Sequence, residues 1–237
     1  MEITYYGHSC FGLSDGTDHV VIDPFLAPNN PAATATVDDV PATAIVITHG
    51  HADHIADAVP LSQRTGAPCV AVVEVANWLD EQGAISTFDP NLGGTVRFDW
   101  GWVKLVQAFH TSTMPGSAET PFSPTTGTTV GQAAGVVVRI GGVTVYHAGD
   151  TCLFGDMKLI AESTPVDVAI LPIGGHYTMD RHDAVTAAKL IGAGLVIPTH
   201  FDTFPPIETD SAAFAADVEA AGAGDAVVLA PGSTHTV

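Results

Sequence analysis

The chain has 237 residues, 46% of them hydrophobic and 14% charged, and its 7 basic and 26 acidic residues give a formal net charge of −19. A chain of this length and apolar content can bury a sizeable core, which excludes intrinsic disorder. No apolar stretch reaches the ~20 residues that a membrane span requires. The excess of acidic groups argues against nucleic acid or an anionic membrane surface as a partner.

The cysteines and the first residues of the chain indicate where it acts. Cys10, Cys69 and Cys152 are odd in number and lie far apart, so they predict no disulfide framework and no metal knuckle. The first six residues show neither the basic nor the apolar region of a signal peptide. We therefore expect a cytoplasmic protein.

The predicted elements alternate between short strands and helices. β-rich or apolar runs bounded by turn residues predict strands, in chain order, at residues 3–6, 10–13, 19–22, 44–48, 69–73, 95–98, 103–109, 136–140, 143–147, 168–171, 195–198 and 226–229. Helices are predicted towards Arg64 and at residues 75–81, 184–191 and 211–221. Strand-rich segments joined by helices thus occur twice, which predicts one domain, residues 1–237, of two sheets packed face to face with helices outside.

One long segment, residues 111–135, is rich in Thr, Ser, Pro and Gly and has no periodicity. Irregular segments of this length in compact domains are usually functional or mobile. Because it begins beside a candidate ligand, it is a candidate wall or lid of a substrate pocket. A contact in a homo-oligomer and a disordered insertion are the alternatives.

The strongest motif is H-x-H-x-D-H, formed by His49, His51, Asp53 and His54 directly after the apolar strand at 44–48. Four potential ligands within six residues at a strand end can converge on one cavity. The two histidines spaced by one residue can bind a cation from the same side, and the adjacent Asp53 and His54 can turn towards a second cation. The motif therefore predicts a metal site with room for two ions.

Three further candidate ligands each follow an apolar strand: His110, Asp150 and His200. A single histidine in such a place is more often a structural residue than a ligand. The spaced cluster together with three strand-end ligands is hard to obtain by chance. We therefore predict a dinuclear centre built from all seven residues.

These residues resemble the metal-binding motifs of the metallo-β-lactamase superfamily. Three segments are similar to predicted metal-dependent hydrolases related to the ascorbate-phosphate lactonase group: Gly7-His8-Ser9-Cys10-Phe11, Ile173-Gly174-Gly175-His176-Tyr177-Thr178-Met179 and Pro198-Thr199-His200-Phe201-Asp202-Thr203-Phe204-Pro205. The resemblance covers the whole chain and implies an α+β fold, an αββα sandwich of two mixed β-sheets with outer helices and the metals at one edge. It also implies one cation on His49, His51 and His110, a second on Asp53, His54 and His200, and Asp150 as the bridge.

Other polar residues are candidates for catalysis or substrate binding. Asp53 is expected to orient the nucleophile or to move its proton, besides binding metal. His8 is either a functional residue at the rim of the site or the cap of a turn. His176 is a candidate catalytic or pocket residue, since many relatives carry Asn-Phe where this chain has His176-Tyr177. Tyr177, Thr178 and Met179 are expected to line the substrate pocket.

The predicted activity is hydrolysis of a small molecule. Two cations would lower the pKa of a bridging water and polarise the attacked group. We expect two divalent ions per chain, Zn²⁺ first, with Mn²⁺ or Fe²⁺ as alternatives. No cluster of Arg or Lys is available for a phosphate, although Arg181 or Lys104 could serve singly, so a lactone or uncharged ester is favoured. A phosphodiesterase and a metal-binding scaffold without catalysis are the alternatives.

Overall fold

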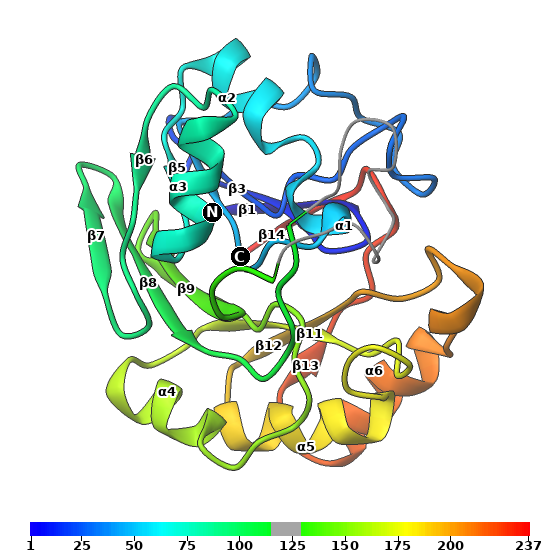
Figure 1. Ribbon diagram of the computed structural model, residues 1–237. Coiled ribbons are helices and arrows are strands. Elements are labelled where there is room, and N and C mark those ends of the chain that lie inside the picture. The colour runs from blue at the N-terminus through cyan, green and yellow to red at the C-terminus, as the bar shows by residue number, and fades with distance from the viewer. Residues whose placement is uncertain (115–128) are drawn as a thin grey trace.

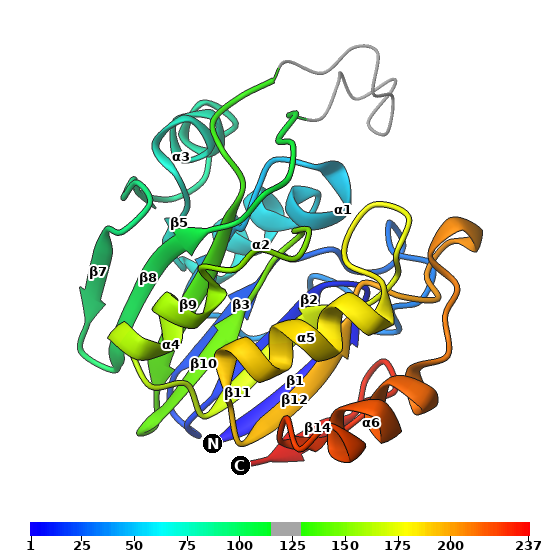
Figure 2. The same cartoon turned by 90° about the horizontal axis from the view of Figure 1, so that it is seen from below.

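The structure is a computed structural model that describes residues 1–114 and 129–237. Two sheets, each with seven strands among the described residues, lie face to face, and helices cover their outer faces (Figure 1, Figure 2). The predicted αββα sandwich is therefore confirmed. Within the described ranges, no helix has both the length and the apolar composition needed to cross a membrane.

The N-terminal sheet has the strand order β14-β1-β2-β3-β4-β5-β6. Its strands are β1 Glu2–Gly7, β2 Cys10–Ser14, β3 His19–Ile22, β4 Ala44–Val46, β5 Cys69–Val70, β6 Thr87–Phe88 and β14 Thr234–Thr236. The pairings from β14 to β3 are antiparallel, and those from β3 to β6 are parallel. Strands β1, β3 and β4 consequently run in one direction and end at the same edge of the sheet.

The C-terminal sheet has the order β13-β12-β11-β10-β9-β8-β7. Its strands are β7 Thr95–Phe98, β8 Gly101–Gln107, β9 Ala134–Ile140, β10 Val143–His147, β11 Val168–Pro172, β12 Leu195–Thr199 and β13 Asp225–Ala226. Here the pairings from β7 to β10 are antiparallel, and those from β10 to β13 are parallel. Strands β8, β10 and β12 therefore also share one direction and one edge.

The helices form the two outer layers of the sandwich. On the side of the N-terminal sheet are α1 Ala52–Ile55, α2 Ala58–Thr65 and α3 Val73–Glu81. On the side of the C-terminal sheet are α4 Met157–Ser163, α5 Arg181–Ile191 and α6 Ser211–Ala220, with a single 3₁₀ turn at Pro205–Ile207 before α6.

Helix α5 shows how the sequence builds these layers. The Asp180 side chain accepts hydrogen bonds from the backbone N–H groups of His182 and Asp183, and Gly192 ends the helix in the left-handed conformation. The buried positions recur at helical spacing: Ala184, Ala187, Ala188 and Ile191. This small-residue stripe packs on the C-terminal sheet, in the same core cluster as Ala169 of β11.

Successive side chains of the central strands point to opposite faces of the sheet, and this divides the core into two layers. In β9, Val136 and Val138 belong to the cluster between the two sheets, whereas Val137 belongs to the cluster beneath the helices of the C-terminal sheet. In β11, Ile170 and Leu171 divide in the same way. Full burial of each such side chain stabilises the fold by about 1.5–3 kcal/mol, and together they fix the strand ends that carry the polar residues.

The structure departs from the predicted elements at several places. The apolar run at 226–229 is a strand only over Asp225–Ala226, because the following residues leave the sheet. The strand expected at 44–48 ends at Val46, and that expected at 103–109 is Gly101–Gln107, so both ligand segments are loops. Helix α4 and the polar strand β14 were not predicted, since neither has a clear apolar period.

Candidate metal centre

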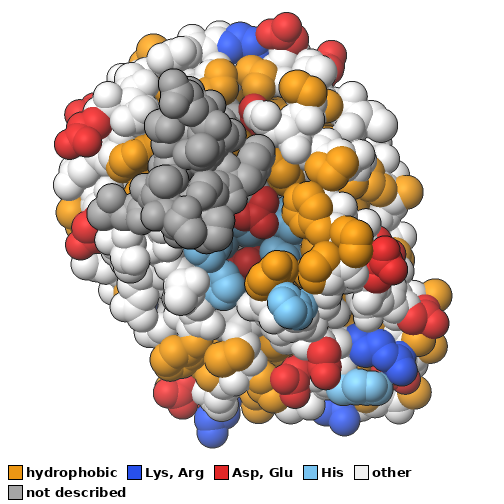
Figure 3. Space-filling model, turned by 45° about the vertical axis from the view of Figure 1, so that its right-hand side comes forward, with side chains coloured by type: hydrophobic (Ala, Val, Ile, Leu, Met, Phe, Trp, Pro, Cys, Tyr) orange, Lys and Arg blue, Asp and Glu red, His pale blue; other side chains and the backbone are white. Residues whose placement is uncertain are grey.

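Six polar residues follow strands that share one direction within their own sheet. His8, Asp23 and His49 follow β1, β3 and β4 of the N-terminal sheet. His110, Asp150 and His200 follow β8, β10 and β12 of the C-terminal sheet. These strand ends meet at one edge of the sandwich, where Figure 3 shows histidine and acidic side chains gathered in a hollow of the surface.

The first group of potential ligands comprises His49, His51, His110 and Asp150, which offer ligating atoms within 4.8 Å of one another. His49 Nε2 and His51 Nδ1 lie 2.9 Å apart, and His110 Nε2 lies 3.5 Å from Asp150 Oδ2. The motif supplies two imidazoles from the loop after β4, and the other two groups come from the opposite sheet. We call these four residues the first cluster.

The second group comprises His8, Asp53, His54 and His200, whose ligating atoms also lie within 4.8 Å of one another. Helix α1 carries Asp53 and His54, while the other two residues follow β1 and β12. Asp53 Oδ2 lies 4.0 Å from His54 Nε2 and 3.9 Å from His200 Nε2. We call these four residues the second cluster.

The carboxylate of Asp150 lies between the two clusters. Its Oδ2 is 3.5 Å from His110 Nε2 and 3.1 Å from His200 Nε2, and its Oδ1 is 3.4 Å from His54 Nε2. One carboxylate thus faces imidazoles of both groups, as the predicted bridge requires. The residues that the resemblance assigned to each ion lie together in the structure, and His8 joins the second group.

The donor set and its hydrogen bonding fit divalent cations. His54 Nε2 and Asp150 Oδ1 are buried and accept or donate no hydrogen bond within the described residues. Buried polar atoms without a partner are costly, and a cation is the partner that imidazole and carboxylate groups share. Imidazole with carboxylate suits Zn²⁺, Mn²⁺ and Fe²⁺ alike. His49, His51 and His110 of the first cluster would hold one ion, and Asp53, His54 and His200 of the second would hold another, with Asp150 facing both.

The pKa values of the histidines differ between the two clusters. Burial lowers the pKa of His49 well below its ordinary value and that of His51 to about 4. Burial would also lower the pKa of His54, but the carboxylates of Asp150 and Asp23 outweigh it and hold that pKa well above the ordinary value. Burial would raise the pKa of Asp150, but His200 and His54 keep it well below its usual range. The imidazoles of the first cluster are therefore uncharged at neutral pH, whereas His54 of the second cluster favours its charged form.

The site's geometry agrees with the comparisons to known proteins. Residues 2–200 match the family model of the β-lactamase superfamily domain. This chain belongs to the metallo-β-lactamase superfamily. The predicted resemblance is thereby confirmed.

Relatives of similar length indicate a group within the superfamily. A UPF0173 metal-dependent hydrolase of Shouchella clausii is 42% identical over 99% of each chain. Another, from Thermus thermophilus, is 46% identical over 91% of this chain and 90% of the relative. Igni18, a metallo hydrolase of the archaeon Ignicoccus hospitalis, superimposes with a TM-score of 0.85 at 36% identity, covering 99% of this chain and 97% of the other. The chain is thus a metal-dependent hydrolase of this superfamily.

Asp23 is a buried residue beside the second cluster that the sequence reasoning missed. Its Oδ2 lies 2.8 Å from His54 Nδ1 and accepts the Thr48 hydroxyl at 2.7 Å, while its Oδ1 accepts the Thr48 backbone N–H. It therefore orients a ligand of the second cluster from behind. The available signal was the same as for the ligands, a carboxylate directly after an apolar strand.

His8 is not at the rim of the site, where the sequence reasoning placed it. Its side chain is fully buried, and its Nε2 lies 3.0 Å from Asp53 Oδ2. Its ring centroid is 4.2 Å from that of His200. Burial lowers the pKa of His8 to about 4. The alternative, a turn cap, is also wrong for the side chain, which is part of the second cluster.

The structure does not bring His176 into either cluster. His176 and Tyr177 are exposed, and their rings stack edge to face at 4.5 Å on the loop between β11 and α5. Thr178 is half-buried, and its backbone neighbour Met179 donates an N–H to the Thr151 carbonyl, next to Asp150. Met179 itself packs in the core beneath the helices, so its side chain is a core residue and not part of a pocket lining.

The base of the segment 111–135 packs against the metal-binding loop. Ser112 Oγ accepts the backbone N–H of Gly50 at 3.1 Å, and Met114 is buried beside the same glycine. Thr113 and Thr129 form an antiparallel bridge. The predicted wall or lid falls largely on residues 115–128, which lie outside the described residues.

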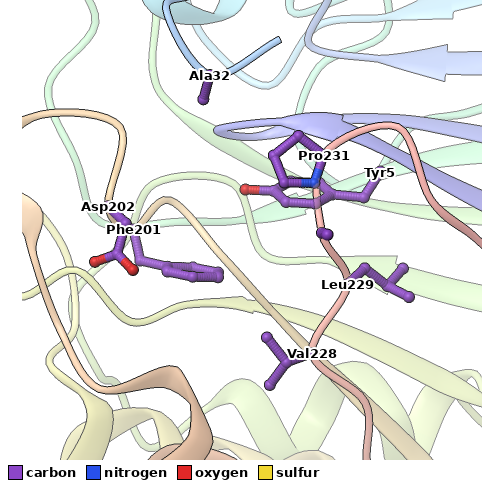
Figure 4. Close-up of a pocket in the computed structure, with 8 residues that line it drawn as sticks. Tyr5, Ala32, Phe201, Asp202, Val228, Leu229 and Pro231 are labelled. Atoms are coloured by element: carbon purple, nitrogen blue, oxygen red, sulfur yellow. The ribbon is translucent and has the colours of Figure 1, made fainter. Parts of the chain in front are cut away.

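A cavity of about 390 Å³ is lined in part by Phe201 and Asp202, the two residues after His200 (Figure 4). It is lined by Tyr5, Ala32, Phe201, Asp202, Val228, Leu229, Ala230 and Pro231. The Tyr5 hydroxyl donates to the His8 carbonyl at 3.1 Å, which connects the cavity wall to the site. No ligand residue lines this cavity, so it is separate from the metal centre.

Proposed function

We propose that this chain is a dinuclear metal-dependent hydrolase of a small, uncharged lactone or ester. The observation that carries the proposal is the position of Asp150, whose two oxygens face His110 of the first cluster and His54 and His200 of the second. A bridging carboxylate between two imidazole-rich groups is the arrangement that holds two cations close together. A site for one ion would use the potential ligands of only one of the two clusters.

Two divalent cations, when bound, supply a hydroxide nucleophile at neutral pH and polarise the attacked carbonyl. His49, His51 and His110 would hold one ion, and Asp53, His54 and His200 the other. Asp53 is the most accessible carboxylate of the site, since 28% of its side chain is exposed, against 3% for Asp150. Its pKa lies below the usual range, because His54 and His8 outweigh the opposing effect of burial. It therefore stays ionised and is placed to accept a hydrogen bond from the nucleophile.

The distribution of basic residues supports an uncharged substrate. The Arg181 guanidinium is bound to Asp217 of α6 at 2.9 Å, so it is already paired. Lys104 lies in the middle of β8, not at the strand end that carries His110. Figure 3 shows blue side chains only away from the hollow on the face in view. A phosphate would meet the carboxylates of Asp53 and Asp150 without a balancing Lys or Arg.

Aromatic side chains near the ligands support an apolar substrate. Phe109, directly before His110, is 53% exposed and packs on Phe154 with ring centroids 5.1 Å apart. Its backbone N–H donates to Thr151 Oγ1, the residue after Asp150. Tyr177 is 55% exposed on the loop that also bonds to Thr151. These rings offer apolar surface for the acyl or ring portion of a substrate.

We also propose that the protein acts in the cytoplasm. Cys10 and Cys69 are buried and Cys152 is exposed, and all three are free thiols. Free thiols are typical of a reducing compartment. A small molecule, and no macromolecule, is the proposed partner.

A substrate panel tests the proposal. Purified chain is loaded with Zn²⁺ or Mn²⁺ and assayed with a neutral lactone, p-nitrophenyl acetate and bis(p-nitrophenyl) phosphate. We expect turnover of the lactone or the ester, reduced at least about 100-fold in Asp150→Asn. Asp156→Asn, an exposed carboxylate six residues along the chain, is the control and should retain wild-type rates. Turnover of the phosphodiester alone would establish a phosphodiesterase instead, and binding of two metals without turnover would leave a scaffold.

A further inference from the structure

The backbone of His8 is held unusually firmly. Its carbonyl oxygen accepts three hydrogen bonds, from the Tyr5 hydroxyl at 3.1 Å, the Thr199 hydroxyl at 2.6 Å and the His200 backbone N–H at 3.0 Å. Its φ of 57° lies in the left-handed region, which is uncommon for a residue with a side chain. Such conformations persist where the surroundings over-determine them, and they concentrate at functional sites. The turn after β1 is thus fixed to the strand end that carries His200.

The side chain of His8 is held at both ring nitrogens. Nε2 lies 3.0 Å from Asp53 Oδ2, and Nδ1 lies 3.0 Å from Thr203 Oγ1. An ionised carboxylate has only lone pairs to offer, so Nε2 must carry the proton of this bond. In neutral imidazole Nδ1 is then the acceptor, and the Thr203 hydroxyl donates to it. The result is a directed chain from Thr203 through His8 to Asp53.

Asp53 has particular need of such a restraint. It lies in the first turn of α1, a helix of four residues, and 28% of its side chain is exposed. The other members of the second cluster, His8, His54 and His200, are at most 2% exposed. A carboxylate that reaches solvent can rotate away from its partners, whereas the buried imidazoles are confined by packing.

We propose that His8 is a positioning residue that holds the Asp53 carboxylate in the orientation needed by the second metal ion, with Thr203 fixing the ring tautomer of His8. The inference rests on the metal centre of the proposed function but not on its substrate. A hydrogen bond to a ligand from a buried group fixes that ligand's direction and commonly changes metal affinity about 10–100-fold. The left-handed backbone conformation of His8 costs conformational free energy, and it is retained where it directs the His8 ring towards Asp53.

Direct ligation by His8 is the competing arrangement. It would need Nε2 without a proton, and therefore Nδ1–H donating to Thr203, whose hydroxyl would then donate to the Phe201 carbonyl. That carbonyl is 3.3 Å from Thr203 Oγ1, farther than His8 Nδ1 at 3.0 Å. The single hydroxyl proton is better placed towards His8. The distances therefore favour the positioning role.

Stepwise metal titration of His8 variants tests the role without any substrate. His8→Leu removes the donor, and His8→Gln keeps an N–H that can reach Asp53. Both variants keep a β-carbon, so the strain of the left-handed backbone at position 8 is the same in each. We expect His8→Leu to weaken binding of the second ion about 10–100-fold while the first ion binds as in the wild type, and His8→Gln to restore most of the loss. Thr203→Val should show a smaller loss of the same kind.

Nitrogen NMR of the wild type keeps the inference testable even where a variant does not fold. In ¹⁵N-labelled protein, the His8 ring signals are assigned as those absent from His8→Gln. We expect a proton on Nε2 and none on Nδ1, both before and after loading with Zn²⁺. A proton on Nδ1, or loss of the Nε2 proton on loading, would establish ligation and overturn the positioning role, as would wild-type affinity for both ions in His8→Leu. A protein that takes up no metal would refute the proposed function, while the metal-free spectrum would still decide the hydrogen bond.

Discussion

His54 Nδ1 lies 2.8 Å from Asp23 Oδ2, and neither side chain is exposed. Because the carboxylate accepts, the proton of this bond sits on Nδ1, and Nε2 is directed towards Asp150 and Asp53. Asp23 reaches this position because it follows β3. His54 lies on α1, the helix that follows the neighbouring strand β4. The pair therefore links the N-terminal sheet to the second cluster.

Replacing Asp23 by Asn should impair the second cluster selectively. The amide presents a donor where the Thr48 and His54 donors already converge, so at least one buried bond is lost. We expect the affinity for the second ion to fall about 10–100-fold, with little change for the first. Isothermal titration with Zn²⁺ measures both steps.

Asp57→Asn is a matched control for this prediction. Asp57 is also buried and accepts the Leu26 backbone N–H at 2.7 Å and the Asn29 side-chain amide at 2.9 Å, but it bonds no ligand. Its replacement should lower the free energy of unfolding and leave both metal affinities unchanged. Equal losses of affinity in the two variants would show that Asp23 acts only through stability.

Metal binding should release protons from one cluster and not from the other. Burial would lower the pKa values of His54 and His200, but the Asp150 carboxylate outweighs it and raises both, that of His54 well above its ordinary value, so the metal-free second cluster favours charged imidazole more than the first cluster does. The pKa values of His49, His51 and His110 are all lowered, chiefly by burial. Ligation requires imidazole in its uncharged form, so we expect binding of the second ion to release protons and binding of the first to release few or none.

The pH dependence of affinity follows from that difference. Affinity of the second cluster should rise with pH throughout the neutral range, whereas that of the first should be flat there. Titration calorimetry at pH 7 in buffers of different ionisation enthalpy counts the protons released at each step. Equal proton release at both steps would contradict the assignment.

Gly174→Ala should damage the site from a distance. A β-carbon on Gly174 would collide with the His200 carbonyl and would lie 2.8 Å from Ile207 Cβ, so the strand end that carries His200 must shift. We expect a loss of about 1–3 kcal/mol in the free energy of unfolding, together with weaker binding of the second ion. Gly155→Ala is the control, because a β-carbon there meets nothing within 4 Å. Chemical denaturation of both variants, with and without metal, makes the comparison.

The metal-free protein should lose stability in mild acid through His147. This side chain is fully buried, its Nε2 faces the Ser9 carbonyl, and its Nδ1 accepts the Gly149 N–H. Burial lowers its pKa from 6.5 to about 4. Since the unfolded chain takes up the proton first, the stabilisation is present above pH 6.5 and is lost as the pH falls towards 4.

A variant isolates that contribution, which amounts to at most about 3 kcal/mol. His147→Gln does not titrate, so its free energy of unfolding should fall less than that of the wild type between pH 7 and pH 4.5. The exposed His182 gives the control, because His182→Gln should keep the wild-type dependence. An unchanged pH dependence in His147→Gln would show that its protonation is not coupled to folding.

The candidate ligands could be singled out from the sequence because each carries a local signal. The motif from His49 to His54 is contiguous, and His110, Asp150 and His200 each follow an apolar run that becomes a strand. Strands of one direction bring their ends to one edge, so apolar patterning was enough to predict convergence. The sandwich followed from the same runs.

The remaining features depend on partners far apart in the sequence. Asp23 meets His54 31 residues away, and Thr203 meets His8 195 residues away, so the partner of each side chain cannot be identified from its neighbours in the sequence. The strand β14 is polar and exists only because β1 offers it an edge. Met179 lies between half-buried Thr178 and exposed Asp180, and only the packing of the core cluster that includes α5 decides that it faces inwards. Such choices are made by tertiary contacts, which periodicity does not encode.

The central claim, a two-metal hydrolytic centre, is tested most directly by elemental analysis of the purified chain before and after chelation, paired with the lactone and ester assay. The account predicts about two divalent ions per chain, and turnover that the chelator abolishes and added metal restores. Chelation should also lower the free energy of unfolding, since the ions bind only the folded chain. No more than one ion per chain at saturating metal, or turnover that survives complete removal of metal, would contradict it.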